Sequence, residues 1–332
     1  MTKRLSEVAD FAGVSTATVG RVLNGKPGIA PETRDAVLTA LDVFGIERPK
    51  HFREDRAGLV GMVVPDLQNP IFPAFSEAVS LRLAKLGLMP VLCTRTADGV
   101  SEAHYIRLLL QHQVAGIVFI GSSYADAGPD YGRELRDRKV PLVLINPADA
   151  NDGASRVSVD DGAAVDQALA HLRALGHDRI GLVLGPVGHV PSARKLAAFV
   201  AQQDGSGTAW RDLVAHTTFS MEGGAAVTGR LLAEGVTGFV CASDALALGV
   251  IRAVRKQGLE VPDDISVVGF DDSLYMTATD PPLTTLRQPI AAMAAAAVAS
   301  LQAQINGNVV TGDEHNFEPE LIVRGSTRIR RP

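Results

Sequence analysis

Apolar and polar positions along residues 5–24 repeat with the period of two short helices joined by a tight turn. The apolar positions at 3.6-residue spacing are Leu5, Val8, Ala9 and Ala12 in the first helix and Val19, Val22 and Leu23 in the second. Between them, Gly13 adopts left-handed backbone angles without a Cβ clash, and Ser15 is a good N-cap. The pattern predicts a helix-turn-helix, which lays one helix in the DNA major groove. The alternative is an ordinary helical hairpin.

The outward face of the second predicted helix is small, hydroxylated and carries one cation. Thr16, Ala17, Thr18 and Arg21 occupy this face. Such a face suits entry into a groove, and arginine is the usual bidentate partner of guanine O6 and N7. Arg21 is therefore the leading candidate for reading a base. Gly20, inside the same helix, costs about 1 kcal/mol of helix stability relative to alanine.

The pattern changes after the first 57 residues. Residues 31–44 predict a third helix, and the charged, proline-containing residues 46–57 are typical of a linker. Beyond the linker, apolar runs of strand length lie at 58–64, 90–93, 116–120, 142–145, 180–184, 238–241 and 266–270. Helical patterns separate them near 73–86, 102–113, 161–175, 192–203, 222–234 and 244–257. This alternation predicts parallel sheets covered by helices on both faces, and its interruption near 150–159 indicates two such sheets.

Composition describes an ordinary globular protein of more than one domain. The chain has 332 residues, of which 46% are hydrophobic and 21% charged. No apolar run reaches the roughly 18 residues of a membrane span, and no apolar leader begins the chain, so we expect a cytoplasmic protein. Cys93 and Cys241 lie in apolar runs without zinc-site spacing, which predicts buried, inert thiols. The formal net charge of −5 arises mainly after residue 57 and leaves the N-terminal segment mildly basic.

Four N-terminal motifs occur together: Arg4-Leu-Ser-Glu-Val-Ala, Ala12-Gly-Val-Ser, Thr18-Val-Gly-Arg-Val-Leu-Asn-Gly and Pro31-Glu-Thr-Arg-Asp-Ala-Val. Their combination resembles the headpiece of the lactose/galactose-repressor (LacI/GalR) family. The resemblance implies a transcriptional regulator, a repressor, that binds double-stranded operator DNA. It places Thr16, Ala17 and Arg21 at base-reading positions, and it places Ser15, Thr18, Asn24 and Thr33 at phosphate-contact positions. Gly20 departs from the family, which commonly has serine there.

The resemblance covers essentially the whole chain and implies its architecture. It predicts an all-α helix-turn-helix headpiece with its linker at 1–57, and an α/β periplasmic-binding-protein-like effector domain at 58–332. The effector domain would consist of two doubly wound parallel-sheet lobes, one at 58–157 and 286–318 and the other at 158–285 and 319–332. The family also implies a homodimer, with the helix 289–305 and the helix after Pro70 as candidate interface elements.

Polar groups follow several predicted strands, at the sheet edge where open α/β sheets bind ligands. An arginine and carboxylates in a cleft suit sugar hydroxyls, because charge-assisted hydrogen bonds are roughly twice as strong as neutral ones. By resemblance, a small carbohydrate effector binds here. Its candidate contacts are Phe72, Asn146, Arg194, Phe219, Asp244 and Asp271, with the two phenylalanines as stacking residues. The alternative for Asp244 is that it caps its own helix.

Enzymatic motifs are missing from the sequence. There is no Gly-x-Gly-x-x-Gly after a strand, no phosphate-binding Gly-x4-Gly-Lys-Ser/Thr loop and no Gly-x-Ser-x-Gly elbow. The histidines form no pair at metal-ligand spacing. We therefore expect no catalytic residue, no cofactor and no metal. A sugar-metabolising enzyme and a free-standing sugar-binding protein remain the alternatives, and the headpiece speaks against both.

Later stretches, including Val190-Pro-Ser-Ala-Arg-Lys and Thr279-Asp-Pro-Pro-Leu-Thr-Thr, look most like the maltose/maltodextrin-type repressors of actinobacteria. This resemblance implies maltose or another α-glucoside as the effector, with other mono- and disaccharides left open. The linker is shorter than in many family members, and Phe52 is its one residue suited to wedge into the minor groove. We expect little or no central kink in the operator.

Overall fold

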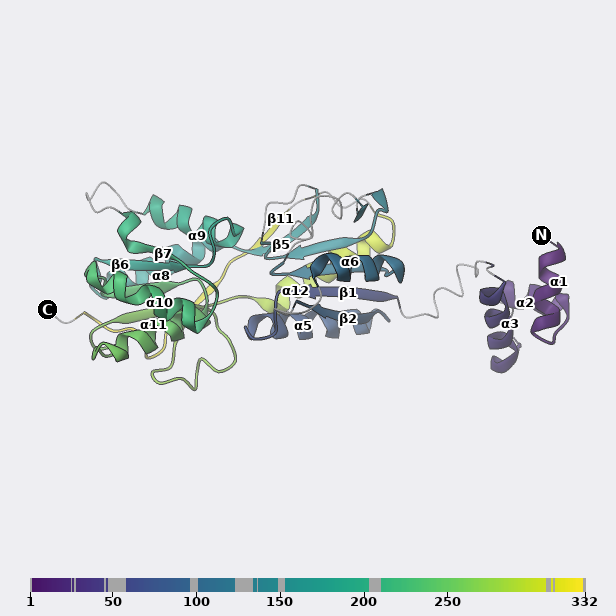
Figure 1. Cartoon of the computed structure of the whole chain (residues 1–332), viewed down its shortest axis with the longest axis horizontal. Coiled ribbons are helices and arrows are strands. Elements are labelled where there is room, and N and C mark those ends of the chain that lie inside the picture. The colour runs from purple at the N-terminus through teal and green to yellow at the C-terminus, as the bar shows by residue number, and fades with distance from the viewer. Residues whose placement is uncertain are drawn as a thin grey trace. The chain divides into compact units, whose positions relative to one another are not determined.

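The structure is a computed structural model of the chain, and it describes residues 2–24, 26, 28–44, 46, 58–95, 101–122, 134–135, 137–148, 153–202, 210–308, 312 and 314–330. Two compact units make up the chain, Met1–Gly58 and Leu59–Pro332 (Figure 1). The expectation for Phe52 lies outside the described residues. Within the described ranges, no helix has the length and apolar character needed to cross a bilayer.

The first unit consists of three helices, α1 (Thr2–Phe11), α2 (Thr16–Leu23) and α3 (Pro31–Val43). Their apolar faces form one small core, whose fully buried members are Val8, Val19, Val37, Ala40 and Leu41. The turn before α2 uses Gly13 at φ +66°, and Ser15 Oγ then accepts a hydrogen bond from the Thr18 amide at 3.1 Å. The predicted helix-turn-helix and its third helix are thus confirmed, because cap, turn and buried face agree in one short segment.

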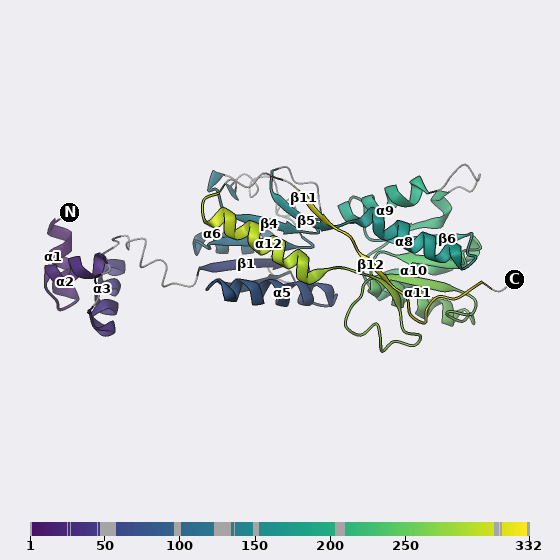
Figure 2. The same ribbon diagram turned by 180° about the vertical axis from the view of Figure 1, so that it is seen from behind.

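The second unit begins with a six-stranded sheet in the order β11-β5-β4-β3-β1-β2, and all of its strand pairs are parallel. The strands are β1 (Leu59–Val64), β2 (Met89–Thr94), β3 (Gly116–Ile120), β4 (Leu142–Ile145), β5 (Ser155–Val159) and β11 (Glu314–Phe317). Helices α5 (Ile71–Lys85) and α12 (Ile290–Ile305) pack together on one face, where Figure 2 shows them in front of the sheet. Helix α6 (Glu102–Gln111) covers the other face, against a separate apolar cluster.

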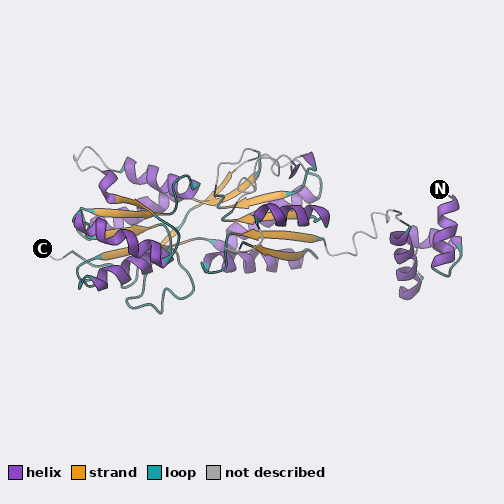
Figure 3. Ribbon diagram, viewed as in Figure 1, coloured by secondary structure: helices purple, strands orange, loops and turns teal. Residues whose placement is uncertain are grey.

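A second six-stranded sheet follows, in the order β12-β10-β9-β8-β6-β7. Its strands are β6 (Ile180–Leu184), β7 (Val214–His216), β8 (Gly238–Cys241), β9 (Ser266–Asp271), β10 (Thr284–Arg287) and β12 (Glu320–Ile322). Helices α8 (Asp161–Ala174) and α9 (Val190–Ala201) cover one face, and α10 (Met221–Ala233) and α11 (Asp244–Lys256) cover the other, with a short 3-10 turn at Trp210–Leu213. Figure 3 shows the strand–helix alternation that the apolar pattern predicts.

The chain passes between the two sheets three times, at residue 160, at 288–289 and at 318–319. Three details differ from the expected pattern. The short strands β7, β10, β11 and β12 lie outside the predicted apolar runs. Residues 155–159 were expected to interrupt the alternation, but they form β5, which pairs with β4 and β11. Polar residues interrupt the apolar ones in this strand, so it does not form a continuous apolar run. Strand β12 runs antiparallel to β10 at the edge of the second sheet, so the sheets are not wholly parallel. The predicted fold class of two doubly wound lobes is otherwise confirmed.

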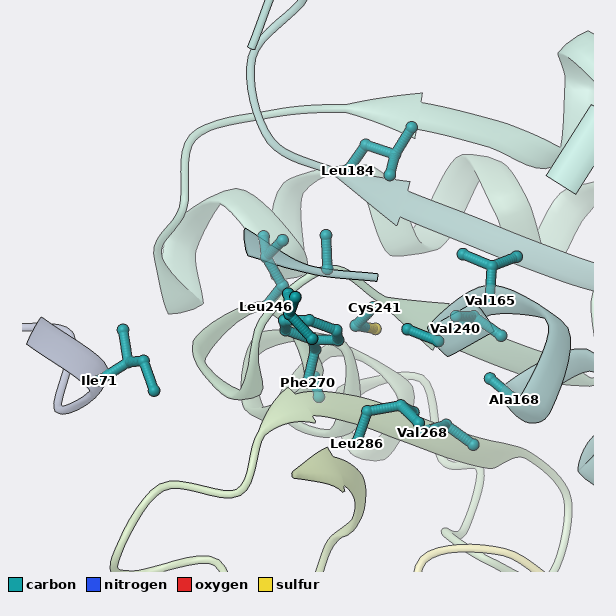
Figure 4. Close-up of a cluster of buried hydrophobic side chains, with 14 of the residues drawn as sticks. Ile71, Val165, Ala168, Leu184, Val240, Cys241, Leu246, Val268, Phe270 and Leu286 are labelled. Atoms are coloured by element: carbon teal, nitrogen blue, oxygen red, sulfur yellow. The ribbon is translucent and has the colours of Figure 1, made fainter. Parts of the chain in front are cut away.

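Side chains from α8, β8 and β9 meet in the core of the second unit (Figure 4). Cys241 lies there, and burial raises the pKa of its thiol; burial also raises the pKa of Cys93 to about 11. Both cysteines are buried and free, which confirms the expectation for them. On α12, the apolar residues Met293, Val298 and Leu301 are buried against the first sheet, so they are not available to an interface.

The last described segment packs on the second sheet through a buried histidine. His177 is 2% exposed, and its ring nitrogens lie 3.0 Å from Thr237 Oγ1 and 3.2 Å from the Arg328 carbonyl oxygen. Burial lowers the pKa of His177, the Arg328 carbonyl and Asp178 oppose this shift, and Arg330 adds to it. The folded chain therefore holds this histidine neutral at a pH where an unfolded chain protonates it.

We expect the stability that His177 contributes to be present above about pH 6.5, the ordinary histidine pKa, and to be lost as the pH falls below it. Melting temperatures of the wild type and of His177→Gln measured from pH 8 to pH 5 test this. The difference between the melting temperatures of the wild type and His177→Gln should become smaller as the pH is lowered. A difference that stays constant, or that widens toward acid, would contradict the assignment.

Candidate functional site

Helix α2 presents most of the predicted DNA-contacting residues on one short element. Ser15, Thr16, Ala17, Arg21 and Asn24 are exposed, and Thr18 is half-buried with its hydroxyl 2.9 Å from that of Ser15. Asn24 ends the helix and donates from Nδ2 to the Gly20 carbonyl at 2.7 Å. Thr33 lies half-buried in the first turn of α3. A Cβ built on Gly20 meets nothing within 4 Å, so a larger residue would fit there.

A cavity of about 420 Å³ lies between the two sheets of the second unit. The carboxyl ends of β1, β3 and β4 bound it on one side, and those of β6, β8 and β9 with the start of α9 bound it on the other. This is the sheet edge where ligands of open α/β folds bind. Four of the six predicted effector contacts line it, namely Phe72, Asn146, Phe219 and Asp271. No group of three or more metal-ligating side chains occurs in the part of the chain that the structure describes.

Two phenylalanine rings line the cavity from opposite sheets, and each rests on a glycine that follows a strand. Phe72 lies against Gly121 after β3, where an added Cβ would fall 2.3 Å from the ring. Phe219 lies against Gly185 after β6, where an added Cβ would fall 2.1 Å from the ring. The rings of His189 and Phe219 also meet in an edge-type arrangement, with centroids 5.2 Å apart and an interplanar angle of 66°. Aromatic faces held this way offer flat apolar platforms to a ligand.

Asp271 belongs to a hydrogen-bonded chain that joins the two sheets. It ends β9 with φ +118°, a conformation that non-glycine residues rarely adopt. Its carboxylate accepts from Gln288 Nε2 at 2.7 Å, and Gln288 Oε1 accepts from Asn146 Nδ2 at 2.8 Å. Asn146 Oδ1 accepts from the Val159 amide at 2.9 Å. Burial and the neighbouring Asp244 raise the pKa of Asp271 well above its usual value, so this carboxyl can take up a proton more readily than an exposed one.

A buried ion pair, which the sequence analysis missed, lines the same cavity. Lys195 of α9 donates to Asp161, and their side chains are 5% and 3% exposed. Lys195 Nζ also lies 3.9 Å from the centroid of the Phe270 ring. Burial raises the pKa of Asp161, and Lys195 opposes that shift. Ser192, one turn earlier on α9, has a buried hydroxyl with no hydrogen-bond partner among the described residues, which leaves it available to a ligand.

The structure does not bring the other two predicted contacts, Arg194 and Asp244, to the cavity. Arg194 points away from it and pairs with Glu314 of β11. Asp244 is 2% exposed, and its carboxylate accepts from Thr285 Oγ1 at 2.6 Å and from the Ser273 amide at 2.7 Å. Nor does Asp244 cap α11, because Ser243 does so. Asp244 therefore ties the ends of β9 and β10 to the start of α11 instead of facing a ligand.

Asp272, the neighbour of Asp271, forms two ion pairs. Its carboxylate accepts from Arg287 Nε at 2.7 Å and from Arg324 Nη2 at 2.5 Å. Asp272 also has a positive φ of 55°. These two ion pairs hold the turn beside Asp271, whose side chain lines the cavity.

Two family models match the chain. Residues 4–45 match bacterial regulatory proteins of the lacI family, and residues 169–327 match a periplasmic binding protein-like domain. The HTH-type transcriptional regulators reg1 of Streptomyces lividans and MalR of Streptomyces coelicolor are each 48% identical to this chain over 98% of its length and 97% of their own.

Solved structures give the same relationship. A transcriptional regulator CelR–cellobiose complex is 28% identical, with a TM-score of 0.71 over 97% of this chain and 99% of that one. A lac repressor dimer bound to operator and the anti-inducer ONPF is 25% identical, with a TM-score of 0.70 over 97% of this chain and 98% of that one.

Proposed function

The chain belongs to the lacI family of bacterial regulatory proteins, and from this we propose that it is a repressor of carbohydrate-utilisation genes controlled by a sugar in the cavity. The observation that carries the proposal is a cavity of about 420 Å³ with two aromatic platforms and buried hydrogen-bonding groups, in the same chain as a helix-turn-helix. Sugars need both features, flat faces for their C–H surfaces and polar groups for their hydroxyls. Its work would be regulation in the cytoplasm and not catalysis.

At the DNA, we assign base reading to Thr16, Ala17 and Arg21, and phosphate contacts to Ser15, Thr18, Asn24 and Thr33. The exposed position of most of these side chains on α2 supports the assignment. Operators of such regulators are near-palindromic because the proteins pair two-fold. We therefore infer a homodimer, as in the lac repressor dimer to which this chain is similar. Exposed Leu81 of α5 and Met89 of β2 suit its interface.

At the cavity, we keep Phe72, Phe219, Asn146 and Asp271 as effector contacts. We add Lys195 and its ion-pair partner Asp161. The CelR–cellobiose complex, to which this chain is similar, supports a disaccharide, and the resemblance to maltose/maltodextrin-type repressors makes maltose our first candidate. A thermal-shift screen of maltose, cellobiose and ribose, repeated with operator DNA, tests this. We expect at least one disaccharide to raise the melting temperature and to change operator affinity. Binding of a purine but of no sugar would overturn the proposal.

Charge in the cavity favours an uncharged ligand. Glu102, Asp161 and Asp271 are buried carboxyls that line it, and Lys195 is the one buried cation among the described lining residues. Arg95 lines it from an exposed position. Lys195 is already paired with Asp161, so an added phosphate would meet carboxyls without a free buried cation to balance it.

Maltose 6′-phosphate is therefore expected to bind more weakly than maltose by about ten- to a hundredfold, or roughly 1–3 kcal/mol, because its phosphate would lose hydration without a free buried cation in exchange. Isothermal titration of both ligands against the full chain measures the ratio. Equal affinity for the two ligands, or a preference for the phosphate, would contradict an uncharged effector while leaving a sugar effector intact.

A further inference from the structure

Arg194 precedes Lys195 on α9, and its side chain joins the two sheets. Its Nη1 and Nη2 donate to Glu314 Oε1 and Oε2 at 2.7 and 2.8 Å, a bidentate pair. Glu314 lies on β11 of the first sheet, whereas α9 covers the second sheet. The side chains are 34% and 19% exposed, so water screens the pair only in part. Bidentate arginine–carboxylate pairs fix geometry as well as charge.

Glu314 is held in place on its own side. Ser158 Oγ of the neighbouring strand β5 donates to Glu314 Oε1 at 2.6 Å. Burial acts to raise the pKa of Glu314, but the hydrogen bonds from Arg194 and Ser158 outweigh it and lower that pKa below its ordinary value. The carboxylate therefore stays ionised, and the partner of Arg194 is preorganised on the first sheet.

The start of α9 has a second tie to the first sheet. The Val190 amide donates to the Ala148 carbonyl, in the segment after β4, at 2.9 Å. Helix α9 then turns Ser192 and Lys195 toward the cavity and Arg194 toward β11. Successive residues of a helix point about 100° apart, so one rigid element carries both the cavity side chains and the tie between sheets.

We propose that the Arg194–Glu314 pair is a positioning pair, which fixes the start of α9 against β11 and so holds the two halves of the cavity together. Arg194 acts through Lys195 and Ser192 and does not contact the ligand. The proposal rests on the sugar-binding function proposed above and adds how that site is assembled. Without the pair, fewer contacts join the two halves, and part of the binding free energy of the sugar is used to bring them together.

The test uses the full chain with Arg194→Met, Glu314→Gln, Arg194→Lys and the exchanged pair Arg194→Glu/Glu314→Arg. Amide hydrogen exchange without ligand should become about three- to tenfold faster in peptides 190–196 and 314–318 for Arg194→Met and Glu314→Gln. The exchanged pair should recover most of the protection. Arg194→Lys should fall between, because lysine keeps the charge but loses the fork. Maltose affinity should also fall by about three- to tenfold in Arg194→Met and Glu314→Gln. It should recover in the exchanged pair and recover in part in Arg194→Lys.

Glu234→Gln is the matched control, since it removes the exposed Arg179–Glu234 pair on the surface of the second lobe, where N and O lie 3.8 Å apart. It should change neither readout. The positioning role would be overturned if amide hydrogen exchange in Arg194→Met were as slow as in the wild type. It would also be overturned if the double variant Arg194→Glu/Glu314→Arg were no better protected than the single variants. Failure of the wild type to bind any sugar would contradict the proposed effector instead, and the exchange data would still decide the role of the pair.

Discussion

Replacement of Lys195 by methionine is expected to lower the free energy of unfolding by about 3–5 kcal/mol, because it leaves the buried Asp161 carboxylate without its cation. Asp161 is 3% exposed, so water cannot replace the lost partner. The loss should shrink as the pH is lowered, since burial raises the pKa of Asp161 and its protonated form is tolerated in apolar surroundings. Urea and thermal unfolding between pH 5 and pH 8 measure both effects.

Two controls separate this effect from a general loss of charge. Asp161→Asn in the Lys195→Met background removes the orphaned carboxylate and should restore much of the stability. Arg138→Met breaks an exposed ion pair with Glu134, where N and O are 2.7 Å apart, and should change stability by no more than about 0.5 kcal/mol. Equal destabilisation by Lys195→Met and Arg138→Met would mean that the buried pair is not a structural element.

Arg21→Ala is expected to weaken operator binding by about 1–3 kcal/mol and to relax the base preference at one symmetric position. The exposed Arg21 side chain lies in the last turn of α2, the helix that the fold presents for the groove. Fluorescence anisotropy with the operator and with operators changed at single positions measures both effects.

Thr33→Ala is the matched comparison, because Thr33 lies on α3 at a proposed phosphate contact. It should weaken binding to operator and to random DNA alike, since phosphate contacts carry no base information. If Arg21→Ala instead left the preferred sequence unchanged, α2 would not be the recognition helix.

The sequence predicted the headpiece well because its information is local. Ser15 caps α2, Gly13 forms the turn, and the apolar positions that share a face, such as Val19 and Val22, form one core. Each of these features can be read within a few residues of chain. The doubly wound second unit was predicted for a similar reason, since buried parallel strands are continuous apolar runs. Strand β5 was not predicted, because polar residues interrupt its apolar positions and it is not a continuous apolar run.

The residues that line the cavity were predicted only in part, because the direction in which each side chain points decides whether it lines the cavity. Sequence placed an arginine at the start of α9, yet the adjacent Lys195 faces the cavity and Arg194 faces β11. One residue of helix rotation separates the two outcomes, and the apolar pattern does not fix the rotation that finely. Asp244 was misplaced for another reason. Its partners Thr285 and Ser273 are distant in sequence, so nothing local reveals that its carboxylate is already used.

The glycines behind the two phenylalanines bear on how relatives of this protein could acquire new ligands. Gly185 has an ordinary backbone conformation, yet a methyl group there would have to displace the Phe219 ring by more than an ångström to reach normal contact distance. The ring would move into the space now open to ligand. Ligand size can thus be tuned by a residue behind the wall of the cavity, without substituting any of the proposed contact residues.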